Sequence, residues 1–283
     1  MDLSIIIVSY NVKEKLRQNL AALYNSQGDF SFEVIVVDND SQDGSAAMVQ
    51  NEFPQVRLIA NSENFGFSKA NNQAIKIAQG NYILLLNPDM QLFPETLINM
   101  LSWGKENQQA VVFSGRLIDI VGENIPHVRR FPKWRDQLAI VLKLPHLFPK
   151  ITNKYLLAKF DYSRAQKVDS VRGSFFFINR QTWQKISGSN LPLLDERYFI
   201  WFEEVDFCRQ VYQKGGEVWY TPQGKALDYV GQSFSQVKTV RKQQYFRRSQ
   251  LRYFAKWHNW GEVLILRAAW ALSGLICLIW RKK

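Results

Sequence analysis

The N-terminal part of the chain alternates between two hydrophobic periods. Short, continuous apolar runs bounded by polar turns are typical of strands that are buried on both faces of a sheet. Between these runs, apolar residues recur at helical spacing, as Leu16, Leu20 and Leu23 do. Because strands alternating with helices of about 10–15 residues form βαβ crossovers, the pattern predicts an α/β domain. We expect a mostly parallel, Rossmann-like sheet with helices on both faces. The expected strands cover residues 3–8, 33–37, 56–60, 82–86 and 110–114.

This regular alternation stops after residue 122. Residues 123–167 contain several prolines among basic and aromatic residues, which predicts a loop-rich insertion, either a lid over a site or a surface excursion. Order returns at residues 168–179, which are typical of a strand pair or one long strand. A helix is expected from about residue 203 to 214, and a strand at residues 217–220.

The positive charge of the chain is concentrated at its C-terminal end. The sequence has 36 Lys and Arg against 25 Asp and Glu, a net charge of +11. Residues 238–283 hold eleven of those cations but only one of the anions, Glu262. Such asymmetry is typical of a surface that binds an anionic partner, either nucleic acid or a membrane face.

The same C-terminal tail carries a long apolar run. Residues 263–280 are apolar except for Arg267 and Ser273, and a helix of that length spans ~27 Å, just short of a bilayer core of ~30 Å. Four tryptophans fall in the tail, and tryptophan favours the membrane interface. We therefore expect a helical tail that contacts a membrane as an interfacial or re-entrant helix, and no nucleic acid. The alternative is a helix packed on the body or in an oligomer.

Cysteine usage and the N-terminus bear on the compartment. Cys208 and Cys277 form neither a metal-binding spacing nor a disulfide framework, which fits a reducing environment. Residues 1–11 lack the basic region and cleavage site of a secretory signal. The expected location is cytoplasmic, at the inner face of the cytoplasmic membrane.

Polar side chains follow four of the expected strands. In parallel α/β sheets, ligands bind beyond the carboxyl ends of the strands. Asp89 and Asn87 stand directly after one buried strand, and their oxygen atoms suit a hard divalent cation that also holds a diphosphate. The alternative for Asn87-Pro88-Asp89 is an ordinary turn. Asp38 extends another strand, where it could accept hydrogen bonds from a nucleobase or ribose, or could simply belong to a turn.

Three carboxylates, Glu203, Glu204 and Asp206, begin the expected helix that follows an aromatic run at residues 198–202. The helix macrodipole alone favours acidic residues in a first turn. A carboxylate among apolar neighbours would also have a raised pKa and could serve as general base toward a sugar hydroxyl.

Several familiar motifs are missing from the sequence. It has neither the phosphate loop of P-loop ATPases nor the glycine fingerprint of dinucleotide-binding dehydrogenases, which argues against both classes. The three histidines, His127, His146 and His258, lie near no carboxylate motif. We expect them to be surface or packing residues.

Four segments, taken together and in order, resemble one family. They are SIIIVSYN at Ser4–Asn11, VIVVDNDSQDGS at Val34–Ser45, NFGFSKANNQAI at Asn64–Ile75 and YILLLNPDMQL at Tyr82–Leu92. They are similar to the family-2 glycosyltransferases of GT-A fold, and most to the bacterial rhamnosyltransferase-like branch, where Asn-Pro-Asp stands in for the usual Asp-x-Asp. The segment from residue 168 to 233 resembles the acceptor-side half of that branch.

The resemblance implies an inverting, metal-dependent glycosyltransferase of cell-surface polysaccharide synthesis. Such an enzyme would move a sugar from a nucleotide-diphospho-sugar, dTDP-rhamnose by the branch resembled, to a hydroxyl of a glycan or lipid-linked acceptor. The implied cofactor is Mg or Mn. The implied domains are a transferase domain (1–237), made of a nucleotide-sugar half (1–122), the insertion (123–167) and an acceptor-side half (168–237), followed by the tail (238–283).

The resemblance also assigns roles to individual residues. The donor-binding residues would be Ser9, Tyr10, Asn11, Asp38, Asn64, Gly66, Phe67, Asn71 and Asn87. Asp89 would address the metal and diphosphate, and Glu204 would be the catalytic base, with Glu203 beside it and Asp206 as the second candidate.

Two positions depart from the family pattern. The family usually has Glu-Asp where this chain has Glu203-Glu204, so the expected base is one methylene longer. It often has a histidine, a candidate metal ligand, near the position where this chain has Asp228. Asp228 would be either a replacement metal ligand or a solvated loop residue. The alternative function is therefore a catalytically degenerate protein that binds a nucleotide-sugar.

Overall fold

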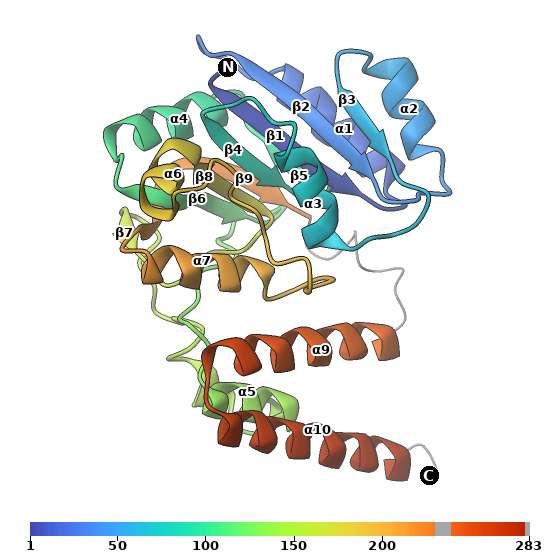
Figure 1. The fold of residues 1–283 in the computed structure, drawn as a ribbon, viewed down its shortest axis with the longest axis vertical. Coiled ribbons are helices and arrows are strands. Elements are labelled where there is room, and N and C mark those ends of the chain that lie inside the picture. The colour runs from blue at the N-terminus through green and yellow to red at the C-terminus, as the bar shows by residue number, and fades with distance from the viewer. Residues whose placement is uncertain (230–238, 281–283) are drawn as a thin grey trace.

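One sheet organises the molecule (Figure 1). The computed structural model describes residues 1–229 and 239–280, and within them nine strands pair in the order β3-β2-β1-β4-β8-β6-β9-β5, with β7 beside β9. The strands are β1 (Leu3–Ser9), β2 (Phe32–Asp38), β3 (Arg57–Ala60), β4 (Tyr82–Leu86), β5 (Met90–Leu92), β6 (Ala110–Ile118), β7 (Gln166–Lys167), β8 (Phe175–Asn179) and β9 (Glu217–Asp228). The helices are α1 (Lys13–Tyr24), α2 (Ser45–Glu52), α3 (Phe67–Ile75), α4 (Thr96–Glu106), α5 (Trp134–Val141), α6 (Arg180–Ser187), α7 (Glu203–Gln213), α9 (Thr239–Trp257) and α10 (Trp260–Trp280).

The predicted N-terminal strands are confirmed. Strands β3, β2, β1 and β4 run parallel, and β6 pairs in parallel with β9, so parallel register covers most of the paired residues. Strand β8 enters antiparallel between β4 and β6. Because β1, β2 and β4 end at the same edge, the polar turns that follow them converge there.

Helices cover both faces of the sheet, as expected. Helices α1, α2 and α4 pack on one face through a core that includes Leu16, Leu20 and Phe113. Helices α3, α6 and α7 pack on the other through a core that includes Ile75, Trp183 and Phe207. The odd and even residues of each parallel strand alternate between these two cores, which explains why the strands read as continuous apolar runs.

One expectation about the second half of the sequence gains detail and another needs correction. The insertion is rich in loops but contains α5 and two short 3₁₀ turns, Leu144–His146 and Pro149–Thr152. At the start of helix α5, the Asp136 carboxylate accepts the backbone N–H of Lys133 at 3.2 Å. Residues 168–179 are also not one long strand or a strand pair, because only β8 is regular and Ser170 forms an isolated bridge to Arg129.

The tail folds back on the body. Helix α10 packs along α5 and α9, and a third core joins α9 and α10 to the start of α7 (Figure 1). That core contains Tyr198 and Phe202 from the body, Tyr253 and Phe254 from α9, and Leu266 from α10. The packed-helix alternative therefore holds for one face of α10. The expected boundary at 237/238 and the cations at 281–283 lie outside the described residues.

The other face of α10 is exposed and mostly apolar, with the exposed Arg267 beside it. Leu264 and Leu272 are each about half exposed, and Trp260 is 79% exposed. Trp270, by contrast, donates its indole N–H to Gln250 Oε1 at 2.7 Å, and Trp257 is likewise bonded inside the protein. Within the described part of the chain, no helix combines the length and apolarity needed to cross a bilayer.

Candidate active site

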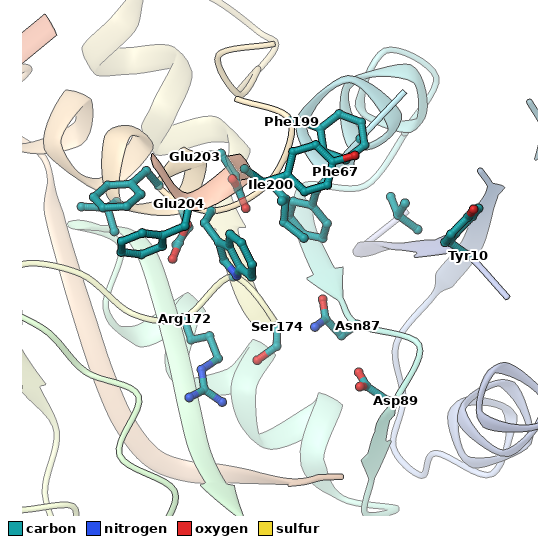
Figure 2. A pocket seen from close by; sticks show the side chains of 18 of the residues that line it. Tyr10, Phe67, Asn87, Asp89, Arg172, Ser174, Phe199, Ile200, Glu203 and Glu204 are labelled. Atoms are coloured by element: carbon teal, nitrogen blue, oxygen red, sulfur yellow. The ribbon is translucent and has the colours of Figure 1, made fainter. Parts of the chain in front are cut away.

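A cavity of about 1280 Å³ opens at the edge where the parallel strands end (Figure 2). One side is lined by the turns after β1, β2 and β4. The other is lined by the start of α7, by the insertion and by α9. The cavity brings together ten of the residues expected from the sequence: Tyr10, Asn11, Asn64, Gly66, Phe67, Asn87, Asp89, Glu203, Glu204 and Asp228.

Asn39 holds the loop before α3 in place. Its Nδ2 donates to Asn64 Oδ1 at 2.9 Å and to the Gly66 carbonyl at 3.3 Å. Its Oδ1 accepts the N–H of Phe65 at 3.1 Å. The residue predicted from the sequence to contact the nucleotide was the neighbouring Asp38, whereas the structure places Asn39 on the cavity wall. An asparagine in the turn after β2 was the available signal, because this side chain can both donate to and accept from a loop.

Gly66 allows that loop to approach the opposite side of the cavity. Its φ is +82°, and a Cβ at this position would lie 2.5 Å from the Phe199 carbonyl oxygen. The next N–H, of Phe67, donates to the same oxygen at 2.6 Å. Only glycine fits both the backbone conformation and the contact. The loop before α3 and the aromatic segment before α7 are thus joined directly.

The Asn87-Pro88-Asp89 turn is fixed from two sides. Asn19, on α1, donates to the carbonyl oxygens of Asn87 at 3.1 Å and Met90 at 2.8 Å. The Asn87 N–H donates to the Ser174 carbonyl at 3.0 Å. These bonds leave the side chains of Asn87 and Asp89 directed at the cavity (Figure 2).

Asp89 directly precedes β5, and Asp228 ends the neighbouring strand β9. Met90 is the register partner of Asp228 in the antiparallel β5–β9 pair, and the Tyr229 N–H donates to the Asp89 carbonyl at 3.3 Å. The Asp228 carboxylate also accepts a hydrogen bond from Arg172 at 3.0 Å. Asp228 is thus a buried, ion-paired strand residue and not a solvated loop residue.

This pair of carboxylates fits a divalent cation shared with a substrate. No group of three or more potential His, Cys, Asp or Glu ligands occurs among the residues that the structure describes. Mg²⁺, however, is commonly held by one or two carboxylates together with substrate phosphates and water. The all-oxygen donor set of Asp89, Asp228 and the Asn87 amide suits a hard cation in that role.

Glu203 and Glu204 emerge from a strained start of α7. Both preceding residues, Trp201 and Phe202, have a left-handed backbone, with φ of 66° and 71°. For bulky residues this conformation costs about 1–3 kcal/mol each, and such strain clusters at functional sites. It turns the helix so that its first two side chains face the cavity (Figure 2).

Burial dominates the acidity of both glutamates. It raises the pKa of Glu203 well above its usual value, and the charge of Glu204 raises it further. Burial also raises the pKa of Glu204, but backbone N–H groups of the helix start and the cations Arg172 and Arg129 oppose this effect. The pKa of Glu203 is thus raised further than that of Glu204. Glu204 is the member that ionises first.

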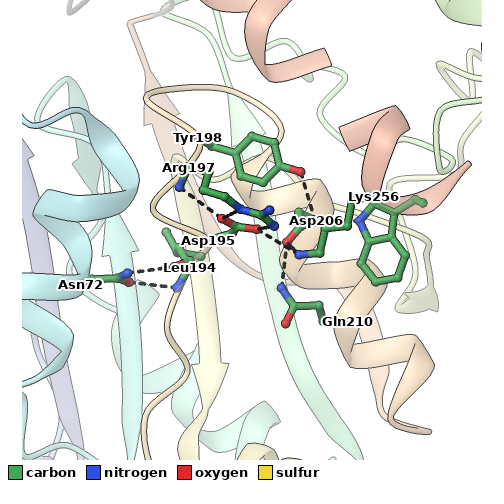
Figure 3. A network of polar contacts seen from close by, with 9 residues as sticks. Asn72, Leu194, Asp195, Arg197, Tyr198, Asp206, Gln210 and Lys256 are labelled. Atoms are coloured by element: carbon green, nitrogen blue, oxygen red, sulfur yellow. Dashed lines mark hydrogen bonds and ion pairs between the residues drawn. The ribbon is translucent and has the colours of Figure 1, made fainter. Parts of the chain in front are cut away.

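Asp206 is placed elsewhere (Figure 3). It is wholly buried, does not line the cavity, and accepts hydrogen bonds from Tyr198, Gln210, Lys256 and Trp257. Because its two carboxylate oxygens already accept these four hydrogen bonds, Asp206 is not open to the hydroxyl of a sugar acceptor. The carboxylate links α7 to the tail instead of serving as a second base.

Three expected donor residues lie behind the cavity wall. Ser9, Asp38 and Asn71 are all at most 3% exposed and are not among the lining residues. Asp38 accepts the Ser41 N–H at 2.9 Å, and Asn71 donates to the Phe67 carbonyl at 2.8 Å. These three residues support the strand-end turns from inside the protein.

Five residues of one cavity wall were not predicted from the sequence. His127, Arg129 and Tyr155 come from the insertion, Arg172 from the segment before β8, and Tyr245 from α9. His127 packs against Tyr162 and Tyr220, as a packing residue would, and it also lines the cavity. Arg172 was detectable, since it lies in the segment that resembles the acceptor-side half. The insertion residues carried no motif.

Comparison with known proteins gives the family. The family model described as glycosyl transferase family 2 matches residues 4–185. Over 172 residues the chain is 31% identical to the uncharacterized glycosyltransferase YfnE of Bacillus subtilis, covering 60% of this chain and 42% of that one. Over 245 residues it is 24% identical to an N-acetylglucosaminyl-diphospho-decaprenol L-rhamnosyltransferase of Mycobacterium tuberculosis, covering 82% of this chain and 77% of that one.

The fold has solved counterparts. A crystal structure of GalNAc-T7 with UDP, GalNAc and Mn²⁺ matches with a TM-score of 0.62 at 15% identity, over 89% of this chain and 48% of that chain. The likeness confirms the GT-A fold. The chain spans less than half of the length of the Bacillus relative. The match over residues 4–185 nevertheless shows that this chain belongs to glycosyltransferase family 2.

Proposed function

We propose that this chain is an inverting glycosyltransferase. It would move a sugar from a nucleotide-diphospho-sugar to a hydroxyl of a glycan or lipid-linked acceptor in cell-surface polysaccharide synthesis. The observation that carries the proposal is a single cavity with the Asn87–Asp89 turn on one side and Glu204 on the other (Figure 2). A leaving group and a base on opposite sides are what a one-step displacement requires.

The donor would bind on the strand-end side. Tyr10, Asn11, Asn64 and Phe67 offer an aromatic ring and amide groups to a nucleotide, with the turns supported by Ser9, Asp38 and Asn71. The name of the Mycobacterium relative describes an L-rhamnosyltransferase that acts on a diphospho-decaprenol sugar. It supports a rhamnosyl donor such as dTDP-rhamnose and a lipid-linked acceptor for this chain.

Asp89 and Asp228, with Asn87 nearby, would hold Mg or Mn. When bound there, a divalent cation would offset the negative charge that grows on the leaving diphosphate. Asp228 would have to turn from Arg172 toward the cation, which would leave Arg172 available to the diphosphate oxygens.

Glu204 would act as the general base. It accepts the proton of the acceptor hydroxyl while that oxygen forms the new bond to the anomeric carbon. The bond to the diphosphate oxygen breaks, and its electron pair leaves with the nucleoside diphosphate. Attack from the opposite face inverts the anomeric carbon. Because burial raises the pKa of Glu203 further than that of Glu204, Glu204 would be the glutamate that carries the negative charge toward the acceptor.

A nucleotide-sugar panel would test this function. Donors with and without Mn²⁺ are scored by thermal shift, and transfer is then assayed with the donor that binds. Glu204→Gln should abolish transfer with donor affinity nearly unchanged. Fully active Glu204→Gln would refute the assignment of the base. A wild-type protein that binds a donor but neither transfers nor hydrolyses it would be the degenerate binder instead.

The tail would attach the protein to the inner face of the cytoplasmic membrane. The exposed Leu264 and Leu272 of α10 provide an apolar face, and the exposed cations of α9 provide attraction to anionic lipids. Replacing both leucines with serine should weaken binding to phosphatidylglycerol vesicles. The matched control is Val121→Ser, since Val121 is 75% exposed in a turn far from the tail in sequence. Equal binding by both variants would exclude the tail as the contact.

A further inference from the structure

The insertion supplies a wall of the cavity that the proposed transfer reaction does not use. His127, Arg129 and Tyr155 line the same cavity as Glu204. Arg129 and Ser170 exchange backbone hydrogen bonds of 3.0 and 3.1 Å, which anchors the start of the insertion to the segment carrying Arg172. This wall is therefore a fixed part of the cavity.

His127 is a buried polar side chain with unused hydrogen-bonding capacity. It is 1% exposed and lines the cavity; neither ring nitrogen makes a well-aligned hydrogen bond among the described residues, and the backbone of Gly115 is near enough to oppose the fall of its pKa. The ring centroids of Tyr162 and Tyr220 each lie 5.8 Å from the centroid of the His127 ring, and the two tyrosines hold the ring in place. Burial, with help from Arg172 and Arg129, lowers the pKa of His127 to about 3. The ring is therefore neutral at working pH and presents one N–H donor and one acceptor.

Arg129 is a partly buried cation without a carboxylate partner. Its guanidinium donates to the carbonyl oxygens of Val128 at 3.1 Å and Pro126 at 3.3 Å, and it forms no ion pair with the described residues. Burial lowers the pKa of Arg129, and the nearby Arg172 lowers it further. Removing such a charge from water is costly unless an anion compensates it. An anionic ligand in the cavity would do so.

We propose that Arg129 and His127 form a binding site for a phosphate group carried by the acceptor. The proposal rests on the proposed function and adds the chemical class of the acceptor. An arginine fork presents two parallel N–H groups to phosphate oxygens, and a neutral histidine can donate a third hydrogen bond. The phosphate could belong to a lipid diphosphate or to a phosphate-containing polymer.

The acceptor side is favoured over the donor side by position. Arg129 and the proposed base Glu204 line the same cavity, and the charge of Arg129 lowers the pKa of Glu204. On the donor side a different cation, Arg172, would be available to the diphosphate once Asp228 turns to the metal. A phosphate at Arg129 would also reduce the stabilisation of ionised Glu204 by that cation, which makes the base stronger when the acceptor is present.

Calorimetry with two soluble phosphate probes tests the site. Geranyl diphosphate and ribitol 5-phosphate are titrated into protein that is saturated with Mg²⁺ and with the nucleoside diphosphate it binds best. We expect at least one probe to bind the wild type and to bind Arg129→Met at least about tenfold more weakly. The matched control is Arg130→Met, because Arg130 is exposed and does not line the cavity. The probe that binds more tightly identifies the source of the phosphate.

Two results would overturn the proposal: neither probe binds the wild type, or Arg129→Met binds both probes as the wild type does. If Arg129→Met does not fold, Arg129→Lys decides, since it keeps the charge but loses the fork and should still bind several-fold more weakly. Affinity for the nucleoside diphosphate is measured in the same series. A wild type that binds no nucleotide refutes the proposed function, whereas normal nucleotide binding with unchanged probe binding refutes only the phosphate site.

Discussion

Asp206 and Glu204 stand two residues apart in the first turn of α7, yet the structure gives them different tasks. Asp206 is wholly buried and accepts hydrogen bonds from Gln210 and Lys256 at 2.7 Å and from Trp257 at 2.6 Å (Figure 3). Glu204 faces the cavity. We predict that Asp206→Asn lowers stability and that Glu204→Gln lowers the rate of transfer.

The expected loss for Asp206→Asn follows from its partners. An asparagine keeps one acceptor oxygen, but its NH₂ group would face the donors now at 2.7 Å. Removing one member of a buried ion pair costs about 3–5 kcal/mol. The Lys256 side chain is 26% exposed, so water can compensate it in part and the lower end applies. At about 2–4 °C per kcal/mol, a loss of about 3 kcal/mol lowers Tm by roughly 6–12 °C.

Thermal melts and single-temperature transfer assays would separate the two residues. Below its melting temperature, Asp206→Asn should retain transfer within about tenfold of wild type, because the carboxylate does not touch the cavity. Glu204→Gln should melt no lower than wild type but lose about 10²–10⁴-fold in rate. The reasoning is refuted if Asp206→Asn melts like the wild type and has lost transfer, since Asp206 would then be catalytic.

Three further predictions use other residues. Gly66→Ala places a Cβ 2.5 Å from the Phe199 carbonyl and should weaken nucleotide binding measured by calorimetry; Gly122→Ala, with φ of +87° and open space around it, should leave that affinity unchanged. The pKa of Glu203 is raised above its usual 4.5, so this residue stabilises the fold fully below pH 4.5, and the contribution is lost as pH rises through the folded-state pKa. In urea titrations, the free energy of unfolding should therefore fall less steeply with pH for Glu203→Gln than for the wild type. Equal slopes for the two proteins would contradict this. Asp228→Asn should weaken Mn²⁺ binding about tenfold or more in spin-resonance titrations with nucleotide present, whereas the exposed Asp161→Asn should not; equal affinities would remove Asp228 from the metal site.

The sheet could be predicted because the burial of its strands on both faces is visible in the sequence as continuous apolar runs. Strands β1, β2 and β4 are apolar on both faces and lie between polar turns, so hydrophobic period alone locates them. Strand β9 was predicted too short, since Pro222 and Gly224 look like breakers. In the fold, Gly224 is required by close packing, because a Cβ there would lie 2.4 Å from Met100 Cγ. A glycine for close approach and a glycine for a turn look alike in sequence.

The site was predictable only where it follows strand ends. The Asn87–Asp89 turn is placed by β4, which the sequence reveals. Arg129 reaches the cavity through its bridge to Ser170, a pairing between residues 41 apart that no local pattern encodes. Helical spacing did contain one unused signal. At about 100° per residue, side chains two positions apart point to nearly opposite sides of a helix, so Glu204 and Asp206 could not both face the acceptor.

The tail is better understood as part of the folded body than as an appendage. Tyr198 and Phe202 share one hydrophobic core with Phe254 and Leu266, and the Tyr245 ring stacks on Phe199 at 4.4 Å between centroids. A chain that ends near Lys256 would lose the α10 side of that core and the indole donor to Asp206. Truncation to remove a membrane contact should therefore also destabilise the start of α7, where Glu204 is held. Point substitutions on the exposed face of α10 avoid this confusion, because that face contributes nothing to the shared core.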